Sequence, residues 1–145
     1  MPFSVGNISF VSINIQECTD VHVARLCNFL ETEVPDIVML QETWLDDSVA
    51  DIPIPGYALV CRRDRTDGPK RGYGGIAIYR KISFNSIAHL ENSLMAERSW
   101  CTVMSDIGPI LLGNWYRPRD ADPKAIESLQ PEVEQIGRAS CRERV

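Results

Sequence analysis

Two polar residues that could do chemistry follow apolar, strand-like segments of this sequence. Asn14 ends the run rich in β-branched residues that begins at Ile8, and Glu42 follows the short apolar run 37–40. A helical pattern lies between the two runs, so they form a strand–helix–strand unit with parallel strands. Because functional side chains gather at the carboxyl ends of such strands, we expect Asn14 and Glu42 to lie side by side at one rim.

A carboxylate at the end of an apolar strand needs a cation, hydrogen-bond donors or solvent, because burying it unpaired is costly. Mg²⁺ meets that need, since it takes one or two carboxylates and keeps its other positions for water and phosphate oxygens. An adjacent amide can hold the carboxylate or the phosphate in place. On spacing alone, a solvated acid beside a turn asparagine is the more common arrangement, so further motifs have to support a metal site.

Further segments supply that support in a fixed order along the chain. They are Gln41-Glu42-Thr43-Trp44, Asp64-Arg65, the glycine-led strand 74–79 and Tyr116-Arg117-Pro118. Together with Asn14 they resemble the endonuclease/exonuclease/phosphatase superfamily, and more finely the endonuclease domain of non-LTR (LINE-type) retrotransposons. The resemblance covers about residues 8–136, and it is carried by the order of five motifs rather than by any one of them.

The resemblance implies a fold, a reaction and roles for three residues. The fold is α/β, a four-layer sandwich of two packed mixed β-sheets flanked by helices, of which this chain would be the N-terminal half. The reaction is cleavage of phosphodiester bonds in DNA with Mg²⁺ or Mn²⁺. Glu42 matches the family's metal ligand, Asn14 the asparagine of its metal and phosphate network, and Tyr116 the tyrosine that contacts the scissile phosphate. The resemblance alone also implies a C-terminal reverse transcriptase domain and a nuclear location.

Two motifs of that family do not occur in this sequence. They are Gly-Asp-x-Asn and a terminal Ser-Asp-His; Ser105-Asp106 is followed by Ile107, and neither His22 nor His89 lies at a family histidine position. The general base and most of the acidic cluster are therefore absent, and we expect a truncated domain that does not cleave DNA. Half a sandwich would also expose an apolar sheet face. Two alternatives stay open: another phosphoesterase acting on lipid or nucleotide phosphates, or a non-catalytic module that binds nucleic acid or protein.

The net charge of −5 argues against a general nucleic-acid coat but allows a local basic patch. Arg25 is the only basic residue among positions 1–51, and the bases concentrate between positions 62 and 81. Phosphate contacts there would give sequence-independent affinity for DNA, and Tyr73 could stack or wedge at a DNA step. A solvated charged hairpin explains the same composition equally well. The candidate DNA-binding residues are Arg62, Arg63, Arg65, Lys70, Arg71 and Tyr73.

The remaining pattern predicts the elements that position these residues. The chain of 145 residues, 44% hydrophobic and 24% charged, is typical of one globular domain. A helix should run from a cap at Thr19 or Asp20 to Val34, because Pro35 ends it. No membrane span or secretory signal is expected, and five scattered cysteines without a CxxC pair favour free thiols in a reducing compartment. Further strands are expected at 57–63, 75–79, 82–90, 100–105 and 110–116, and a last helix from 122 or 123 to about 135.

The last residues look foreign to the domain. Residues 136–145 have neither an apolar period nor turn residues, and they can be back-translated into a string that resembles a sequencing adapter. We therefore expect the authentic domain to comprise residues 1–136, residues 137–145 to be an artefact, and the natural protein to continue beyond residue 136. The alternative is a genuine basic tail that binds something acidic.

Overall fold

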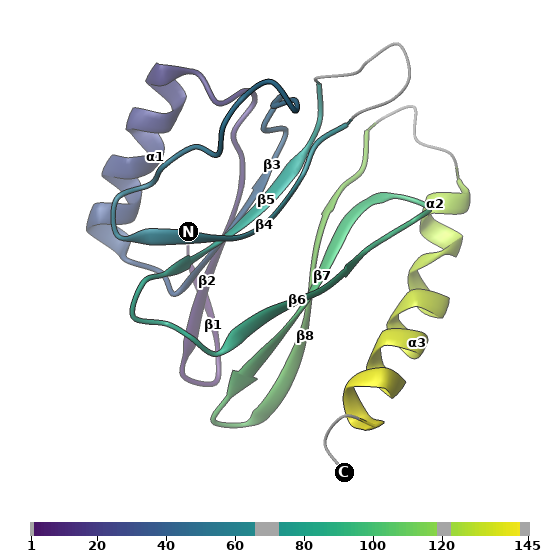
Figure 1. Cartoon of the computed structure of the whole chain (residues 1–145). Coiled ribbons are helices and arrows are strands. Elements are labelled where there is room, and N and C mark those ends of the chain that lie inside the picture. The colour runs from purple at the N-terminus through teal and green to yellow at the C-terminus, as the bar shows by residue number, and fades with distance from the viewer. Residues whose placement is uncertain (1, 66–72, 119–122, 143–145) are drawn as a thin grey trace.

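The computed structural model describes residues 2–65, 73–118 and 123–142, and in it the chain forms four layers (Figure 1). One helix packs on a five-stranded sheet, a three-stranded sheet packs on the other face of that sheet, and a last helix covers the outer side. This is the α/β architecture expected from the sequence. The elements are β1 (Phe3–Val5), β2 (Ile8–Asn14), α1 (Asp20–Glu33), β3 (Ile37–Gln41), β4 (Tyr57–Arg63), β5 (Ile76–Lys81), β6 (Ile87–Asn92), β7 (Glu97–Ser105), β8 (Gly108–Tyr116), α2 (Lys124–Glu127) and α3 (Leu129–Arg142).

The strand–helix–strand unit is confirmed. β2 and β3 are parallel neighbours, and their register places Asn14 opposite Gln41. The Thr19 hydroxyl caps α1 by accepting the N–H of His22 at 3.1 Å. At the other end Val34 adopts the left-handed conformation (φ 46°) and its N–H bonds the carbonyl of Leu30. The unit therefore delivers the ends of both strands to one rim, as predicted.

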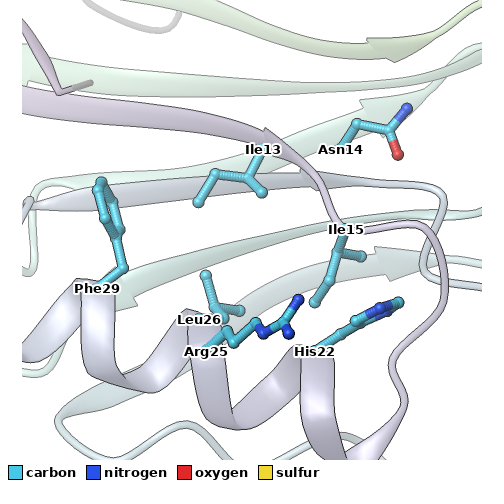
Figure 2. A pocket seen from close by; sticks show the side chains of 7 residues that line it. All are labelled: Ile13, Asn14, Ile15, His22, Arg25, Leu26 and Phe29. Atoms are coloured by element: carbon cyan, nitrogen blue, oxygen red, sulfur yellow. The ribbon is translucent and has the colours of Figure 1, made fainter.

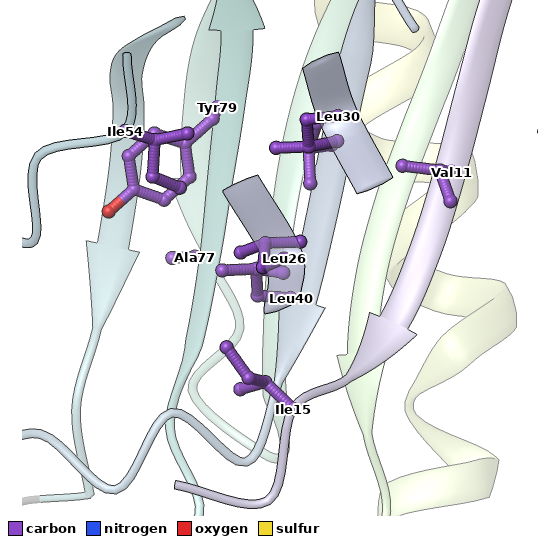
Figure 3. Packing of buried hydrophobic residues seen from close by; sticks show 9 residues of the cluster. Val11, Ile15, Leu26, Leu30, Leu40, Ile54, Ala77 and Tyr79 are labelled. Atoms are coloured by element: carbon purple, nitrogen blue, oxygen red, sulfur yellow. The ribbon is translucent and has the colours of Figure 1, made fainter. Parts of the chain in front are cut away.

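The five-stranded sheet has the order β1-β2-β3-β5-β4 and buries both of its faces. One apolar cluster fills the space between this sheet and α1 (Figure 3). The other lies between the two sheets. Because both faces are covered, Ile37, Val38, Met39 and Leu40 are all at most 5% exposed. The exposed apolar face expected for half a sandwich is therefore absent at β3, since β6, β7 and β8 within this same chain cover it.

The three-stranded sheet, with the order β6-β7-β8, is antiparallel throughout its described length, whereas a second mixed sheet was expected. Short turns connect its strands, and such turns produce antiparallel neighbours. The strand predicted from Ile82 begins only at Ile87, because Arg80 holds the preceding turn through the carbonyls of Ile82 (2.9 Å) and Phe84 (3.2 Å). The strand β1 was not predicted.

The last helix is divided where a continuous helix was expected. α2 ends at Glu127, and α3 begins at Leu129 with Pro131 in its first turn, where a missing N–H costs little. α3 continues to Arg142, past the position at which the foreign tail is expected to begin, so that boundary stays a prediction. Among the described residues, no helix is long and apolar enough to cross a membrane.

Candidate active site

Two of the three predicted site residues meet across the two sheets. The hydroxyl of Tyr116, at the end of β8, donates to Oε1 of Glu42 at 2.7 Å, although 74 residues separate them in the sequence. Burial raises the pKa of Tyr116 to about 12, and the hydrogen bond and charge of Glu42 act in the same direction. Tyr116 is therefore protonated near neutral pH and is a hydrogen-bond donor.

Asn14 lies at the same rim, held by the loops that follow β2 and β3. The Asn14 side-chain oxygen accepts the N–H of Gln16 at 3.2 Å. The two loops are bonded to each other: Ile15 N–H donates to the carbonyl of Gln41 at 3.0 Å, and Glu17 N–H donates to that of Glu42 at 2.8 Å. The sequence-predicted proximity of Asn14 to Glu42 thus follows from paired strands that continue as paired loops.

The backbone at this rim is strained. Gln16, Glu17, Glu42 and Trp44 have φ angles of 50°, 84°, 55° and 56°, and Val34 is the only other non-glycine residue of the described chain with a positive φ. Each such conformation costs on the order of 1–3 kcal/mol and persists only where surrounding contacts enforce it. Strain of this kind gathers at ligand-binding and catalytic sites, so the backbone supports the same location as the motifs.

Glu97 is a second carboxylate of this region that the sequence did not single out. It begins β7 and lies opposite Tyr116 in the β7–β8 register. Its carboxylate accepts from Arg65 Nη2 at 2.6 Å and from the N–H of Gly75 at 3.2 Å. No local pattern marks it, because its position depends on pairing with a strand that comes later in the chain.

Asn114, two residues before Tyr116, is another polar residue of this region to which the sequence assigned no role. It is 1% exposed, and its amide group donates to the carbonyls of Leu40 and Ala77, both at 3.1 Å. Its oxygen accepts from Nε2 of Gln41 at 2.8 Å. Asn114 therefore ties β8 to β3 and β5 two residues before Tyr116, which contacts Glu42. The only sequence signal for it is a polar residue within the apolar run 110–116.

Three of the arginines predicted to contact DNA lie in the described residues, and each forms ion pairs or hydrogen bonds with other protein groups. Arg62 pairs with Asp64 at 2.9 Å and with Asp51 at 3.0 Å. Arg63 donates to the carbonyls of Ala96 and Arg98, while Arg65 pairs with Glu97. Their DNA-binding role stays a prediction that has to be reconciled with these bonds. Tyr73 is 53% exposed, and Lys70 and Arg71 lie outside the described residues.

Gly74 allows the Arg65–Glu97 ion pair to approach the backbone. Its φ is +67°, and a Cβ there would lie 2.6 Å from Glu97 Oε1 and 2.7 Å from Arg65 Nη2. We expect Gly74→Ala to lower the free energy of unfolding by up to about 1 kcal/mol more than Gly56→Ala, because the flexible ends of Arg65 and Glu97 have to move and their ion pair is weakened. Gly56 is the matched control, because its φ of +83° imposes the same strain but no atom lies within 4 Å. Urea unfolding of both variants measures the difference, and equal losses would refute the crowding argument.

A cavity of about 230 Å³ opens beside Asn14, between the end of β2 and α1 (Figure 2). Its walls are mostly apolar, and Nδ1 of His22 is hydrogen-bonded to the Glu17 carbonyl at 2.9 Å rather than directed at Glu42. His22 therefore packs beside the rim with its Nδ1 bonded to the backbone. The lining residues are Ile13, Asn14, Ile15, His22, Arg25, Leu26 and Phe29.

The oxygen ligands at the rim suit a hard cation, but they would fill only part of its coordination shell. Glu42 offers a carboxylate and Asn14 an amide oxygen, and Mg²⁺ accepts so few protein ligands because it keeps waters. Within residues 2–65, 73–118 and 123–142, no three His, Cys, Asp or Glu side chains are grouped so that they could hold a metal. The residues present therefore fit Mg²⁺ with most of its positions left to water or substrate.

Comparison with known proteins agrees with this architecture. Residues 11–138 match the endonuclease/exonuclease/phosphatase family, so the chain belongs to that family. Among solved structures, the chain is similar to the endonuclease domain of TRAS1, a telomere-specific non-LTR retrotransposon, with a TM-score of 0.55 and 16% identity. The likeness covers 90% of this chain and 52% of that one, so this chain spans about half the length of that domain. No curated protein matches the chain.

Proposed function

We propose that this chain is part of a Mg²⁺-dependent DNA endonuclease of the retrotransposon type. The observation that carries the proposal is the 2.7 Å hydrogen bond between Tyr116 and Glu42, formed at a rim that also holds Asn14. Membership of the family supports phosphodiester hydrolysis. The similar TRAS1 domain, an endonuclease of a retrotransposon, supports DNA as the substrate. By the same analogy, the whole protein carries a reverse transcriptase domain and acts in the nucleus.

Each residue of the rim has a role in this proposal. Glu42 and Asn14 hold the cation, with Mn²⁺ as an alternative to Mg²⁺. When bound, the ion polarises a phosphoryl oxygen and stabilises the leaving oxyanion. Tyr116 keeps its proton because its pKa is raised to about 12, so its hydroxyl can donate to Glu42 or to a phosphate oxygen. The rim thus binds and orients a phosphodiester.

The proposed chain is incomplete as a catalyst. The sequence contains neither Gly-Asp-x-Asn nor Ser-Asp-His, so it supplies ligands for metal and phosphate but no general base of the family type. We therefore expect no nicking of plasmid DNA by the isolated chain. In this proposal the authentic domain comprises residues 1–136, and residues 137–145 do not belong to it. Nicking that requires Mg²⁺ and disappears with Glu42→Gln would refute the inactivity.

Metal binding is tested by thermal unfolding of the full chain at increasing Mg²⁺ concentration. A ligand at one hundred times its dissociation constant stabilises the folded state by about 2.7 kcal/mol. We expect a rise in Tm for the wild type and none for Glu42→Gln. Glu91→Gln is the control, because Glu91 is an exposed residue of β6. A wild-type Tm that does not respond to Mg²⁺ or Mn²⁺ would instead favour a non-catalytic module on the same scaffold.

A further inference from the structure

An aromatic pair at the rim has no role in the function proposed above. The rings of Trp44 and Tyr73 meet edge to face, with centroids 5.1 Å apart and an interplanar angle of 68°. Trp44 follows Glu42 by two residues, so their Cα atoms are at most about 7 Å apart. The aromatic pair therefore lies next to the place where Glu42 and Tyr116 meet.

The position of Trp44 is enforced by its backbone. Its φ of 56° is unfavourable for a bulky side chain and has to be maintained by other contacts. The Trp44 N–H donates to the carbonyl of Gly74 at 2.8 Å, and the Thr43 N–H donates to that of Gly75 at 3.3 Å. The indole is thus presented on a loop bonded to the segment that carries Tyr73.

Tyr73 differs from the other three tyrosines. Tyr57 donates its hydroxyl to the carbonyl of Pro35 at 2.7 Å, Tyr79 to that of Ile52 at 2.8 Å, and Tyr116 to Glu42. Tyr73 is 53% exposed, and within the part of the chain that the structure describes its hydroxyl has no hydrogen-bond partner. Its ring is therefore available for contact with a ligand.

We propose that Trp44 and Tyr73 form a stacking platform for a nucleobase one or two nucleotides from the phosphate at Glu42 and Tyr116. The proposal rests on the proposed function for the identity of the ligand. Successive bases along a strand are spaced by about 3.4 Å, so two steps span about 7 Å, which is the upper limit on the Cα separation of Trp44 from Glu42. Aromatic side chains bind bases through their flat faces without sequence preference.

The platform also restricts the kind of DNA that fits. A base inside an intact duplex already stacks on both of its neighbours, so only an unpaired or displaced base presents a face to Tyr73. The preferred substrate is therefore a single strand, or a duplex distorted next to the phosphate that is bound. Stacking of one base contributes about 5- to 150-fold in affinity.

The test uses the full chain in EDTA with a short DNA oligonucleotide that carries the fluorescent base 2-aminopurine. We expect the single strand to bind with quenched fluorescence and more tightly than its duplex. Tyr73→Ala and Trp44→Ala should each weaken binding about 5- to 150-fold, whereas Tyr73→Phe should retain it because the ring remains. Tyr73→Ala is the decisive variant, since removing an exposed side chain leaves the fold intact.

Phe3→Ala is the matched control. Phe3 is 48% exposed and stacks on Phe10 with ring centroids 5.3 Å apart, but it lies in β1 opposite Phe10, four residues before Asn14 in β2. Unchanged affinity in Tyr73→Ala, an equal loss in Phe3→Ala, or equal binding of single strand and duplex would overturn the platform. Because the assay contains no metal, loss of the Mg²⁺ response would count against the proposed function alone.

Discussion

Replacement of Glu132 by glutamine is expected to lower the free energy of unfolding by about 3–5 kcal/mol, because it leaves a buried arginine without its counter-charge. Glu132 lies on α3 and accepts from Trp100 Nε1 at 2.9 Å, Ser93 Oγ at 2.7 Å and Arg98 Nη2 at 3.3 Å. Arg98 is 1% exposed. The contacts of this one carboxylate join α3 to the outer face of the three-stranded sheet.

Arg98 is enclosed by groups that suit a cation. Its guanidinium lies 4.6 Å from the ring centroid of Trp115 and 5.7 Å from that of Trp100. It also donates to the hydroxyl of Ser128 at 2.8 Å and to the carbonyl of Ala125 at 3.4 Å. Because these partners enclose Arg98, water cannot reach its guanidinium to replace the negative charge that Glu132→Gln removes.

The Glu132 variant also changes how stability depends on pH. Burial by itself raises the pKa of Glu132, but hydrogen bonds from Trp100 and Ser93 together with the charge of Arg98 lower it below its ordinary value of 4.5. A carboxyl group whose pKa is lowered by folding stabilises the protein above the unfolded pKa. That stabilisation is lost as the pH falls below about 4.5 and through the folded pKa. Glu132→Gln should remove this part of the acid dependence.

Glu134→Gln provides the control on the same helix. Glu134 is 52% exposed and lies 3.9 Å from Arg138, a surface pair one helical turn away. Such pairs contribute about 0.3–0.5 kcal/mol, so little change is expected. Thermal and urea unfolding between pH 3 and pH 8 compare the two variants. Similar losses at both positions would show that Arg98 does not depend on Glu132.

The second large effect is expected for Asn114→Asp. The aspartate has nearly the same shape, but it can no longer donate to the carbonyls of Leu40 and Ala77 and would place negative charge against both. A buried group deprived of its partner in this way costs about 3–5 kcal/mol when charged. The Mg²⁺ response proposed above should weaken as well, because Leu40 precedes Glu42 by two residues and Asn114 precedes Tyr116 by two residues.

For Asn114→Asp, stability should change with pH in the opposite direction to the change that Glu132 produces. Burial without a partner raises the pKa of the introduced carboxyl above its unfolded value of about 3.9. The variant is therefore closest to the wild type at low pH, and it loses stability as the pH rises through the folded pKa. Asn92→Asp makes the same chemical change at an exposed residue, whose side-chain oxygen accepts from Ser99 Oγ at 2.7 Å and lies 3.1 Å from Nε2 of His89. If both aspartates cost the same at pH 7, the inter-sheet role of Asn114 is wrong.

These results separate what the sequence predicts from what it does not. Helix α1 and strands β2 and β3 follow from local patterns: β-branched runs, helical spacing, and a cap followed by proline. Motif order singles out Asn14, Glu42 and Tyr116 as candidate site residues, and the structure brings them to one rim. Glu97 and Asn114 are different, because their contacts join strands of two sheets. No local pattern encodes which strands become neighbours.

The arginines of the basic segment show that the sequence alone also does not predict which charges form ion pairs. A concentration of bases between positions 62 and 81 predicts a phosphate-binding patch, but composition does not reveal which charges are already paired. Arg62 is held by Asp51 and Asp64, and Arg65 by Glu97. Asp51 belongs to the acidic N-terminal third and Glu97 to a later strand, so only the folded structure brings them to these arginines.

The distance along the chain between Glu42 and Tyr116 has a consequence during protein synthesis. At about 5–20 residues per second, the ribosome needs roughly 4–15 s to add the 74 residues between them. β1 to β5 have all been synthesised by then, and they can pair as the five-stranded sheet once they leave the ribosome. The nascent chain thus carries Glu42 without its tyrosine until β8 is made, and the contact between the two sheets at this rim forms only after that.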